Sequence, residues 1–256
     1  MASRLYSCWY HAAVSRKRSS RPSEGQDDPD PLERGNASGR ATRELIMQTA
    51  ERLFAERGLH GVSLREIGLA AGQRNNYAAQ YHFGDRDALI KAIYEYRARE
   101  LNERRLASVA AIETERKPEN AADLLRALLE PHARHIGDPE WNFLGFLAQL
   151  RVARGHFNFA ETERPDYMEG YDVIVERIRD SFPHLSDEVF ARRFEVAFGW
   201  AISAMASYER TVNGVGPFAM TVPQLLDEIV IMLVGALGAA TGATEGRALR
   251  SVSDRS

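Results

Sequence analysis

The sequence is poor in several features that mark common protein classes. Its 256 residues include a single cysteine, Cys8, so an internal disulfide is excluded and nothing indicates an oxidising compartment. It shows no alternating strand pattern of useful length and no internal repeat. The apolar run IVIMLVGALGAA is too short to span a bilayer, and the opening MASRLYSCWYHAAV lacks the features of a cleaved signal peptide. We therefore expect an all-α, cytoplasmic protein without a membrane segment.

Motifs of enzyme chemistry are also missing. The sequence contains no G-x-S-x-G, H-E-x-x-H or phosphate-loop pattern. His132 and His135 lie three residues apart with Glu130 nearby, a spacing that could present ligands to a metal. Because no second pair of ligands accompanies them, we expect no metal, no cofactor and no catalytic residue. A helical metal-binding protein or enzyme that uses Glu130, His132 and His135 remains the alternative.

Charge is distributed unevenly along the chain, whose formal net charge is −3. Residues 40–106 hold 12 Lys and Arg against 9 Asp and Glu, whereas the chain beyond residue 106 holds 15 against 22. A basic N-terminal third followed by an acidic body fits one domain that meets phosphates and another that does not.

The stretch 62–86, VSLREIGLAAGQRNNYAAQYHFGDR, predicts two short helices joined by a tight turn. Ser63 and Glu66 have the spacing of a capping box, so the first helix is expected to begin at Ser63. Gly72 is expected to end it, because glycine adopts the left-handed backbone that closes a helix. The second helix is predicted to run from about Asn75 to His82.

This second helix is expected to turn Ala79 and Phe83 inward and polar side chains outward. In a helix-turn-helix, the second helix enters the DNA major groove, and amide side chains match the edge of adenine. The spacing alone fits a polar surface turn between two ordinary helices equally well. The side chains predicted to reach base edges are Asn75, Asn76, Tyr77 and Gln80.

Residues 43–105 resemble the DNA-binding domain of the tetracycline-repressor (TetR) family of bacterial transcription regulators. The likeness is carried by RELIMQTAERLFAERG with LHGVSLREIG, by the turn at Ala71-Gly72, and by YHFGDRDALIKAIY. One departure is that the chain is one residue longer than the commonest family pattern between Gly72 and Phe83. The resemblance implies that Arg86 touches the phosphate backbone, and the other predicted contacts to phosphates or nearby DNA are Tyr81, His82, Ser63 and Arg65.

We predict four segments along the chain: a disordered arm (1–39), a helix-turn-helix DNA-binding domain (40–106), a helical ligand-binding and dimerisation domain (107–243) and a disordered tail (244–256). The basic cluster at 16–21 fits a DNA-contacting arm or an ordinary solvated run. The first helix is expected at Thr42–Arg57, with a buried stripe of Leu45, Ile46, Thr49, Leu53 and Phe54. Later helices are expected over Asp85–Ala111, from Asn120, after Asp138-Pro139, and over Arg164–Phe182, Ser186–Val212 and Pro223–Ala240.

The last two of these helices have more apolar surface than one neighbour can cover. The helix after Ser186 carries an apolar stripe from Phe190 to Tyr208, and a second stripe of small residues formed by Gly199, Ser203, Ala206 and Ser207. We expect both helices to pair with their copies across a two-fold axis, as the resemblance also implies. The alternative is that both faces are buried in one monomeric core.

The helical body is expected to hold a small, largely apolar effector between its helices. Ordinary core packing is the alternative for each candidate residue, and the sequence does not identify the effector. With the resemblance, these features predict a ligand-responsive repressor that binds a palindromic operator in double-stranded DNA as a homodimer. The candidate effector-binding residues are Trp141, Phe143, Phe146, Tyr167, Met168 and Tyr171.

Overall fold

The computed structural model describes residues 37–114, 120–153, 166–212 and 220–240, and all regular structure within these ranges is helical. The predicted all-α class is therefore confirmed. Residues 1–36 of the predicted arm and the whole predicted tail lie outside the described residues. The elements are α2 (Ala37–Arg57), α3 (Leu64–Ala70), α4 (Ala78–Phe83), α5 (Arg86–Thr114), α6 (Ala121–Ala133), α7 (Phe143–Val152), the 3-10 turn η3 (Asp166–Met168), α8 (Glu169–Asp180), α9 (Asp187–Val212) and α10 (Val222–Gly238).

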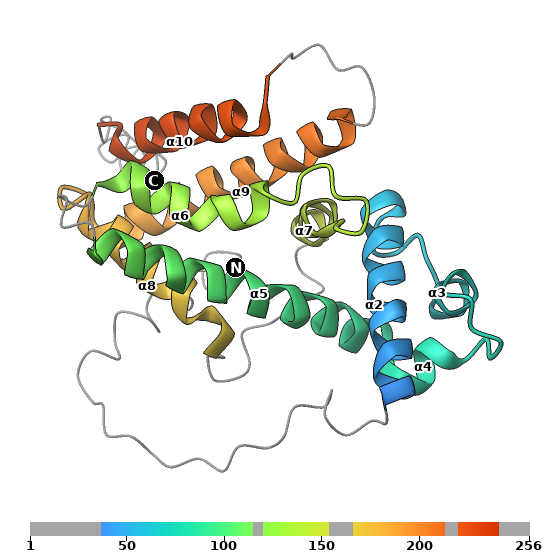
Figure 1. The fold of residues 1–256 in the computed structure, drawn as a ribbon. Helices are drawn as coiled ribbons and strands as arrows, with labels where there is room; N and C mark the ends of the chain where they lie inside the picture. The colour runs from blue at the N-terminus through green and yellow to red at the C-terminus, as the bar shows by residue number, and fades with distance from the viewer. Residues whose placement is uncertain (1–36, 115–119, 154–165, 213–219, 241–256) are drawn as a thin grey trace, which may run out of the picture.

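The helices form two groups that α5 joins. Helices α2, α3 and α4 gather at one end of the molecule, and α5 runs from there into a body built from α6, α8, α9 and α10 (Figure 1). Helix α7 packs against both α2 and α9, so it bridges the two groups. Each group has its own buried hydrophobic cluster, and the aromatic residues of α7 belong to the cluster around α2.

Helix α2 begins five residues earlier than predicted and ends as expected before Gly58, whose φ is +79°. Ile46, Leu53 and Phe54 are almost fully buried. Leu45 is 45% exposed, so its predicted burial is wrong. It lies one helical turn before Thr49, where the burial of this side of the helix begins.

One helix start in the body differs from prediction. Helix α7 begins at Phe143, because Asp138 instead accepts the backbone N–H of Glu140 at 3.0 Å and forms a turn ahead of the helix. Helix α8 begins at Glu169 with η3 directly before it, and the predicted start at Arg164 lies outside the described residues. By contrast, the predicted cap at Asn120 is present and accepts the N–H of Asp123 at 3.0 Å.

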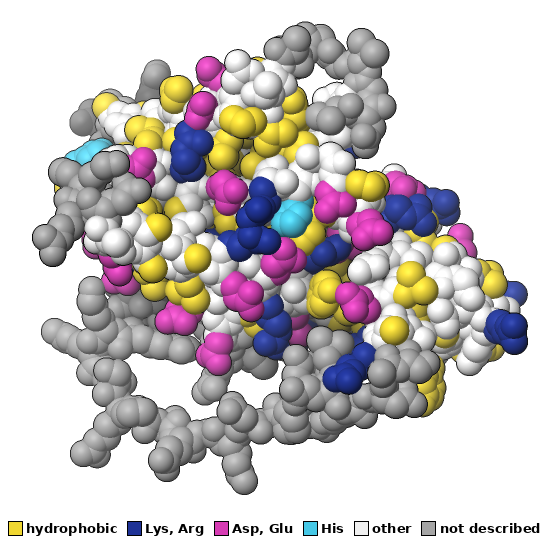
Figure 2. All heavy atoms as spheres, viewed as in Figure 1, with side chains coloured by type: hydrophobic (Ala, Val, Ile, Leu, Met, Phe, Trp, Pro, Cys, Tyr) yellow, Lys and Arg dark blue, Asp and Glu magenta, His cyan; other side chains and the backbone are white. Residues whose placement is uncertain are grey.

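The last two helices keep an exposed apolar face. Helix α9 exposes Val196 and Trp200, and α10 exposes Ile231 and Met232 (63% and 54% exposed). Hydrophobic side chains lie open over α10 at the top of Figure 2. The predicted small-residue stripe divides, since Ser203 and Ser207 are exposed while Gly199 and Ala206 are buried. Within the described ranges, no helix is both long and apolar enough to cross a membrane.

Candidate nucleic-acid interface

Helix α3 begins where the capping box predicts. The backbone N–H of Ser63 donates to Glu66 Oε2 at 2.8 Å, and the N–H of Glu66 donates to Ser63 Oγ at 3.2 Å. The Ser63 hydroxyl also donates to Glu66 Oε2 at 2.6 Å, and this bond, followed by the one from the Ser63 N–H, holds the pKa of the Glu66 carboxyl below its usual value. Gly72 follows the helix with φ +68°, as expected of a residue that ends one.

Helix α4 starts three residues later than predicted, at Ala78, so the prediction that Asn75 opens the helix is wrong. The side-chain oxygen of Asn75 accepts the backbone N–H of Tyr77 at 3.0 Å, a local bond that competes with helical pairing. Asn75 and Asn76 therefore lie in the turn before α4, and Tyr77 is its N-cap. The inward anchors are as predicted, because Ala79 and Phe83 are buried.

The outward side of this unit presents large side chains to solvent. Tyr77 and Tyr81 are 68% and 82% exposed, and Gln80 is exposed beside them on the same short helix. Ser63 and Arg65 are exposed at the start of α3. The fold thus brings the predicted contact residues to one end of the molecule, where Lys and Arg side chains also gather (right side of Figure 2).

His82 and Arg86 are held more firmly than the other candidates. The guanidinium of Arg43 donates to the backbone carbonyl of His82 at 2.8 Å and lies over the Phe83 ring at 4.1 Å. Burial, followed by the charge of Arg43, lowers the pKa of His82, so its ring is neutral near pH 7 and offers a phosphate a hydrogen bond without a charge.

Arg86 donates through Nη2 to the carbonyl of Val62 at 2.9 Å, which fixes its direction. Arg86 and Gln80 line the same hollow of about 530 Å³ on the helix-turn-helix unit. The hollow therefore places an amide and a guanidinium, the two groups predicted to meet a base edge and a phosphate, next to each other.

The predicted effector residues fall into two separate groups. Trp141, Phe143 and Phe146 are almost fully buried in the cluster around α2, where Phe146 lies 6.3 Å from Phe54 between ring centroids. They form part of the packing between the DNA-binding end and α7.

Tyr167, Met168 and Tyr171 lie on η3 and α8, against α5. Tyr94 connects the two groups, because its ring is 6.2 Å from Phe143 and its hydroxyl lies 3.7 Å from the sulfur of Met168. Tyr167 donates to Glu95 at 3.3 Å, and the ring of Tyr171 lies under the guanidinium of Arg105.

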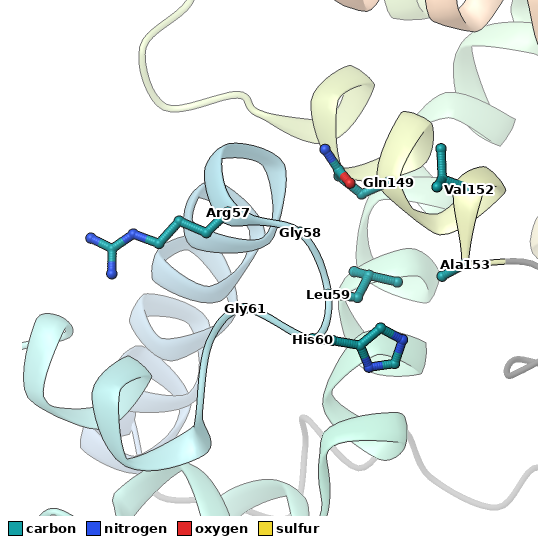
Figure 3. Close-up of a pocket in the computed structure, with 8 residues that line it drawn as sticks. All are labelled: Arg57, Gly58, Leu59, His60, Gly61, Gln149, Val152 and Ala153. Carbon is teal, nitrogen blue, oxygen red and sulfur yellow. The ribbon is translucent and has the colours of Figure 1, made fainter.

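A second hollow of about 360 Å³ lies between the turn after α2 and the end of α7, and none of the six predicted effector residues lines it. Figure 3 shows Leu59 and His60 extending from the turn toward α7, while Arg57 points the other way. The remaining lining residues are Gly58, Gly61, Gln149, Val152 and Ala153.

The residues of the metal alternative are not brought together. His132 is buried and accepts a hydrogen bond from Arg105, whereas His135 stacks on Trp141 with ring centroids 3.7 Å apart. Glu130 forms no cluster with them: the described part of the chain holds no group of three His, Cys, Asp or Glu side chains that could bind a metal ion.

Sequence reasoning missed two buried arginines on α5. Arg97 and Arg105 are 6% and 4% exposed, in register with the buried residues Ile93, Leu101 and Val109. Along α5, every fourth residue from Ile93 to Val109 is alternately apolar and arginine. This pattern in the sequence could have indicated that the two arginines are buried.

Comparison with known proteins identifies the helix-turn-helix unit. Residues 46–93 match the family model described as bacterial regulatory proteins, tetR family. No curated protein sequence matches the chain.

Among solved structures, the chain is similar to AibR in complex with isovaleryl coenzyme A and operator DNA. The sequence identity is 20%, the match covers 75% of this chain and 97% of AibR, and the TM-score is 0.50. It is also similar to PfmR, a TetR family transcriptional regulator from Thermus thermophilus (17% identity, 73% and 96% covered, TM-score 0.45). The fatty acid degradation regulator FadR from Bacillus halodurans matches at 13% identity, 78% and 97% coverage and a TM-score of 0.44. The likeness to AibR agrees with the predicted arrangement of an N-terminal helix-turn-helix domain followed by a helical domain.

Proposed function

We propose that this chain, which belongs through residues 46–93 to the bacterial regulatory proteins of the tetR family, is a repressor that binds a palindromic operator as a homodimer. The observation that carries the proposal is the exposed set of Tyr77, Gln80 and Tyr81 on a short helix whose other side is anchored by Ala79 and Phe83. Tyr81 packs edge-on against the neighbouring His82 ring, but both tyrosines leave most of their surface in solvent, which suits contact with a partner molecule.

The position of the two asparagines supports the same assignment. In a helix-turn-helix, the N-terminal residues of the second helix contact the base edges. Asn75 and Asn76 lie in the turn directly before α4, and Tyr77 caps it. We propose that these residues and Gln80 read the bases, while Arg86, Tyr81, His82, Ser63 and Arg65 position the helix on the sugar-phosphate backbone.

The exposed apolar face of α9 and α10 supports the dimer. Val196, Trp200, Ile231 and Met232 would be covered by the same residues of a second copy in a two-fold interface. Two recognition helices would then lie about 34–36 Å apart, one turn of DNA, and read a palindrome. Light scattering should give the mass of two chains at micromolar concentration, and Trp200→Glu should shift it toward one.

The helical body would carry the regulatory signal. A small molecule that binds between α5, α7 and α8 can lower operator affinity only by favouring a state in which the recognition helices are wrongly spaced. Because α5 runs from Arg86 at the DNA-binding end to Thr114 in the body, it is the element through which that change would pass.

The proposal is tested on the operator recovered by selection from random DNA. Gln80→Ala should weaken operator binding by about 1–3 kcal/mol and relax the sequence preference. Arg86→Ala should weaken binding to operator and random duplex alike and reduce the slope of log K against log salt by about one. Fluorescence anisotropy at several salt concentrations measures both effects.

Arg104→Ala is the matched control, because Arg104 is half-exposed, pairs with Glu100 and lies 18 residues beyond Arg86 on α5. It should bind both DNAs like the parent. If Gln80→Ala and Arg86→Ala also behave like the parent, these residues do not contact DNA.

A further inference from the structure

Arg105 is a buried cation that pairs with no carboxylate of the described residues. Its Nε and Nη2 donate to the backbone carbonyl of Leu128 at 3.4 and 3.3 Å, and Nη2 also donates to His132 Nε2 at 3.0 Å. Among the described residues, no Asp or Glu oxygen lies within 4 Å of the guanidinium. Burial lowers the pKa of Arg105 to about 10, which leaves it charged at neutral pH.

His132, beside Arg105, has a ring nitrogen, Nδ1, without a hydrogen-bond partner among the described residues. Because Nε2 accepts from Arg105, the proton of the neutral ring is on Nδ1. Nδ1 is fully buried and has no hydrogen-bond partner among the described residues. Burial, and then the charge of Arg105, hold the pKa of His132 well below its usual value, so the ring stays neutral. The pair thus combines one positive charge with a neutral ring, and no anion among the described residues accompanies them.

The groups around this pair are aromatic or apolar. Phe143 stacks on His132 with centroids 6.1 Å apart, and the ring of Tyr171 lies 5.6 Å from the Arg105 guanidinium carbon. Tyr94 lies between Phe143 and Met168. A buried charge that lacks a counter-ion is costly, and an anion that entered with an apolar remainder would offset that cost.

We propose that the Arg105 guanidinium, which His132 Nε2 helps to hold in place, binds the carboxylate of a small-molecule effector whose apolar part packs against Phe143, Met168 and Tyr171. That this molecule regulates DNA binding rests on the proposed function above; that it binds here does not. A carboxylate fits better than a phosphate dianion, because the site supplies one cation and a monoanion neutralises it completely. Three of the residues predicted from sequence to hold an effector therefore surround a polar centre that the sequence reasoning did not include.

Binding at this site would act directly on α5. Gly170 of α8 packs so closely that a Cβ there would meet Arg105 Cβ at 2.9 Å and the Asn102 backbone oxygen at 3.0 Å. A carboxylate on the Arg105 guanidinium would therefore bind next to the close contact between α5 and α8. The same helix begins at Arg86, a predicted phosphate contact.

The test measures ligand binding to the full-length chain by calorimetry and thermal melting. The probes are acetate, butyrate, octanoate, benzoate and phenylacetate, with octan-1-ol and inorganic phosphate as comparisons. At least one of the larger carboxylates should bind and raise the melting temperature, while octanol and phosphate should not. Arg105→Met should weaken that carboxylate at least about tenfold, as expected for loss of a charge-assisted hydrogen bond.

Arg104→Met is the matched control, because Arg104 precedes Arg105 on α5 but is half-exposed and paired with Glu100. It should bind the carboxylate like the parent, and Arg105→Lys should retain part of the affinity even if Arg105→Met folds poorly. The proposal is overturned if no carboxylate binds the parent, if octanol binds as well, or if both Arg105 variants bind as the parent does. Operator binding without any probe is measured on the same samples, so that a failure to bind DNA is distinguished from a failure to bind carboxylate.

Discussion

Helix α5 carries two buried arginines, eight residues apart on one face, and the two differ in their hydrogen-bond partners. Arg97 is paired with Glu51 through two bonds, Nε–Oε2 at 2.7 Å and Nη2–Oε1 at 3.2 Å, and also donates to the carbonyl of Glu140 at 3.1 Å. Arg105 has a carbonyl and a neutral imidazole as its only hydrogen-bond partners among the described residues. The charge of Arg97 is therefore neutralised by a carboxylate, whereas the charge of Arg105 is not neutralised by any described residue.

The difference follows from what each arginine joins. Glu51 lies on α2 and also accepts the backbone N–H of Asn142, the N-cap of α7, at 2.8 Å. The Arg97 site thus ties three helices together, with Trp141 stacked over the guanidinium at 4.1 Å. The Arg105 site joins α5 to α6 and α8 and leaves its charge available. We interpret Arg97 as a residue that stabilises the packing of the three helices, and Arg105 as a residue that binds a ligand.

The largest expected effect is at the paired site. Arg97→Met would leave the Glu51 carboxylate buried without its cation, and we expect it to lower the free energy of unfolding by about 3–5 kcal/mol. Urea denaturation followed by circular dichroism measures the loss. The matched control is Arg52→Met, which removes one partner of the exposed Arg52–Glu56 pair on α2 and should cost no more than about 1 kcal/mol. Equal losses in the free energy of unfolding of the two variants would contradict the structural role of Arg97.

The sequence predicted the features that local geometry determines. The capping box at Ser63, the end of α3 before Gly72 and the buried pair Ala79 and Phe83 all depend on residues within four positions of one another. The start of α4 was missed because the amide of Asn75 bonds to the backbone two residues ahead. Asn residues favour both helix starts and such turns, and spacing alone does not separate the two.

The partners of the buried arginines could not be predicted in the same way. Glu51 and Arg97 are 46 residues apart, and Arg105 and His132 are 27 apart, so their pairing depends on how helices pack. For the same reason the sequence placed Phe143 in an effector pocket without Arg105, the cation bonded to the His132 ring on which Phe143 stacks. The candidate DNA contacts were easier to name, because a short stretch from Ser63 to Arg86 contains them all.

The second effect tests how closely α8 packs against the unpaired site. Gly170→Ala would place a methyl group 3.0 Å from a backbone oxygen of Asn102, which cannot rotate away. We expect a loss of about 1–3 kcal/mol in the free energy of unfolding, typical of overpacking. Gly238→Ala is the control, because a Cβ at Gly238 on α10 would make only an ordinary contact, 3.5 Å from Phe182 Cε1. If Gly170→Ala is as stable as Gly238→Ala, α8 has room to move and the site is looser than described.

A smaller effect is expected when the unpaired arginine itself is removed. Arg105→Met removes a charge that is paired with no carboxylate of the described residues, so no buried anion is left without its partner. The hydrogen bonds that are lost destabilise the fold, but the variant no longer has to bury an unpaired charge. We expect the free energy of unfolding to change by less than about 1 kcal/mol in either direction. Chemical denaturation beside Arg97→Met provides the direct comparison. A loss as large as that of Arg97→Met would mean that Arg105 is also a structural residue.

The last effect concerns a second acid at the paired site, and it appears only as a dependence on pH. Burial, and then the nearby Glu51 carboxylate, raise the pKa of Glu209 on α9 to about 7 from an ordinary value of 4.5. The folded chain therefore keeps this proton between pH 4.5 and 7 while the unfolded chain loses it, and stability falls as pH rises through that window.

Glu209→Gln cannot titrate, so the variant should gain stability relative to the parent as pH rises from 5 to about 7, with no further gain above that. Burial raises the pKa of Glu51 and lowers that of His132, so the parent's own pH profile sums opposite slopes. The difference between parent and variant in urea denaturation at each pH isolates Glu209. A difference that stays constant from about pH 5 to 8 would show that this acid is ionised in the folded chain, leaving Arg97 with more negative charge nearby than its bonds to Glu51 alone supply.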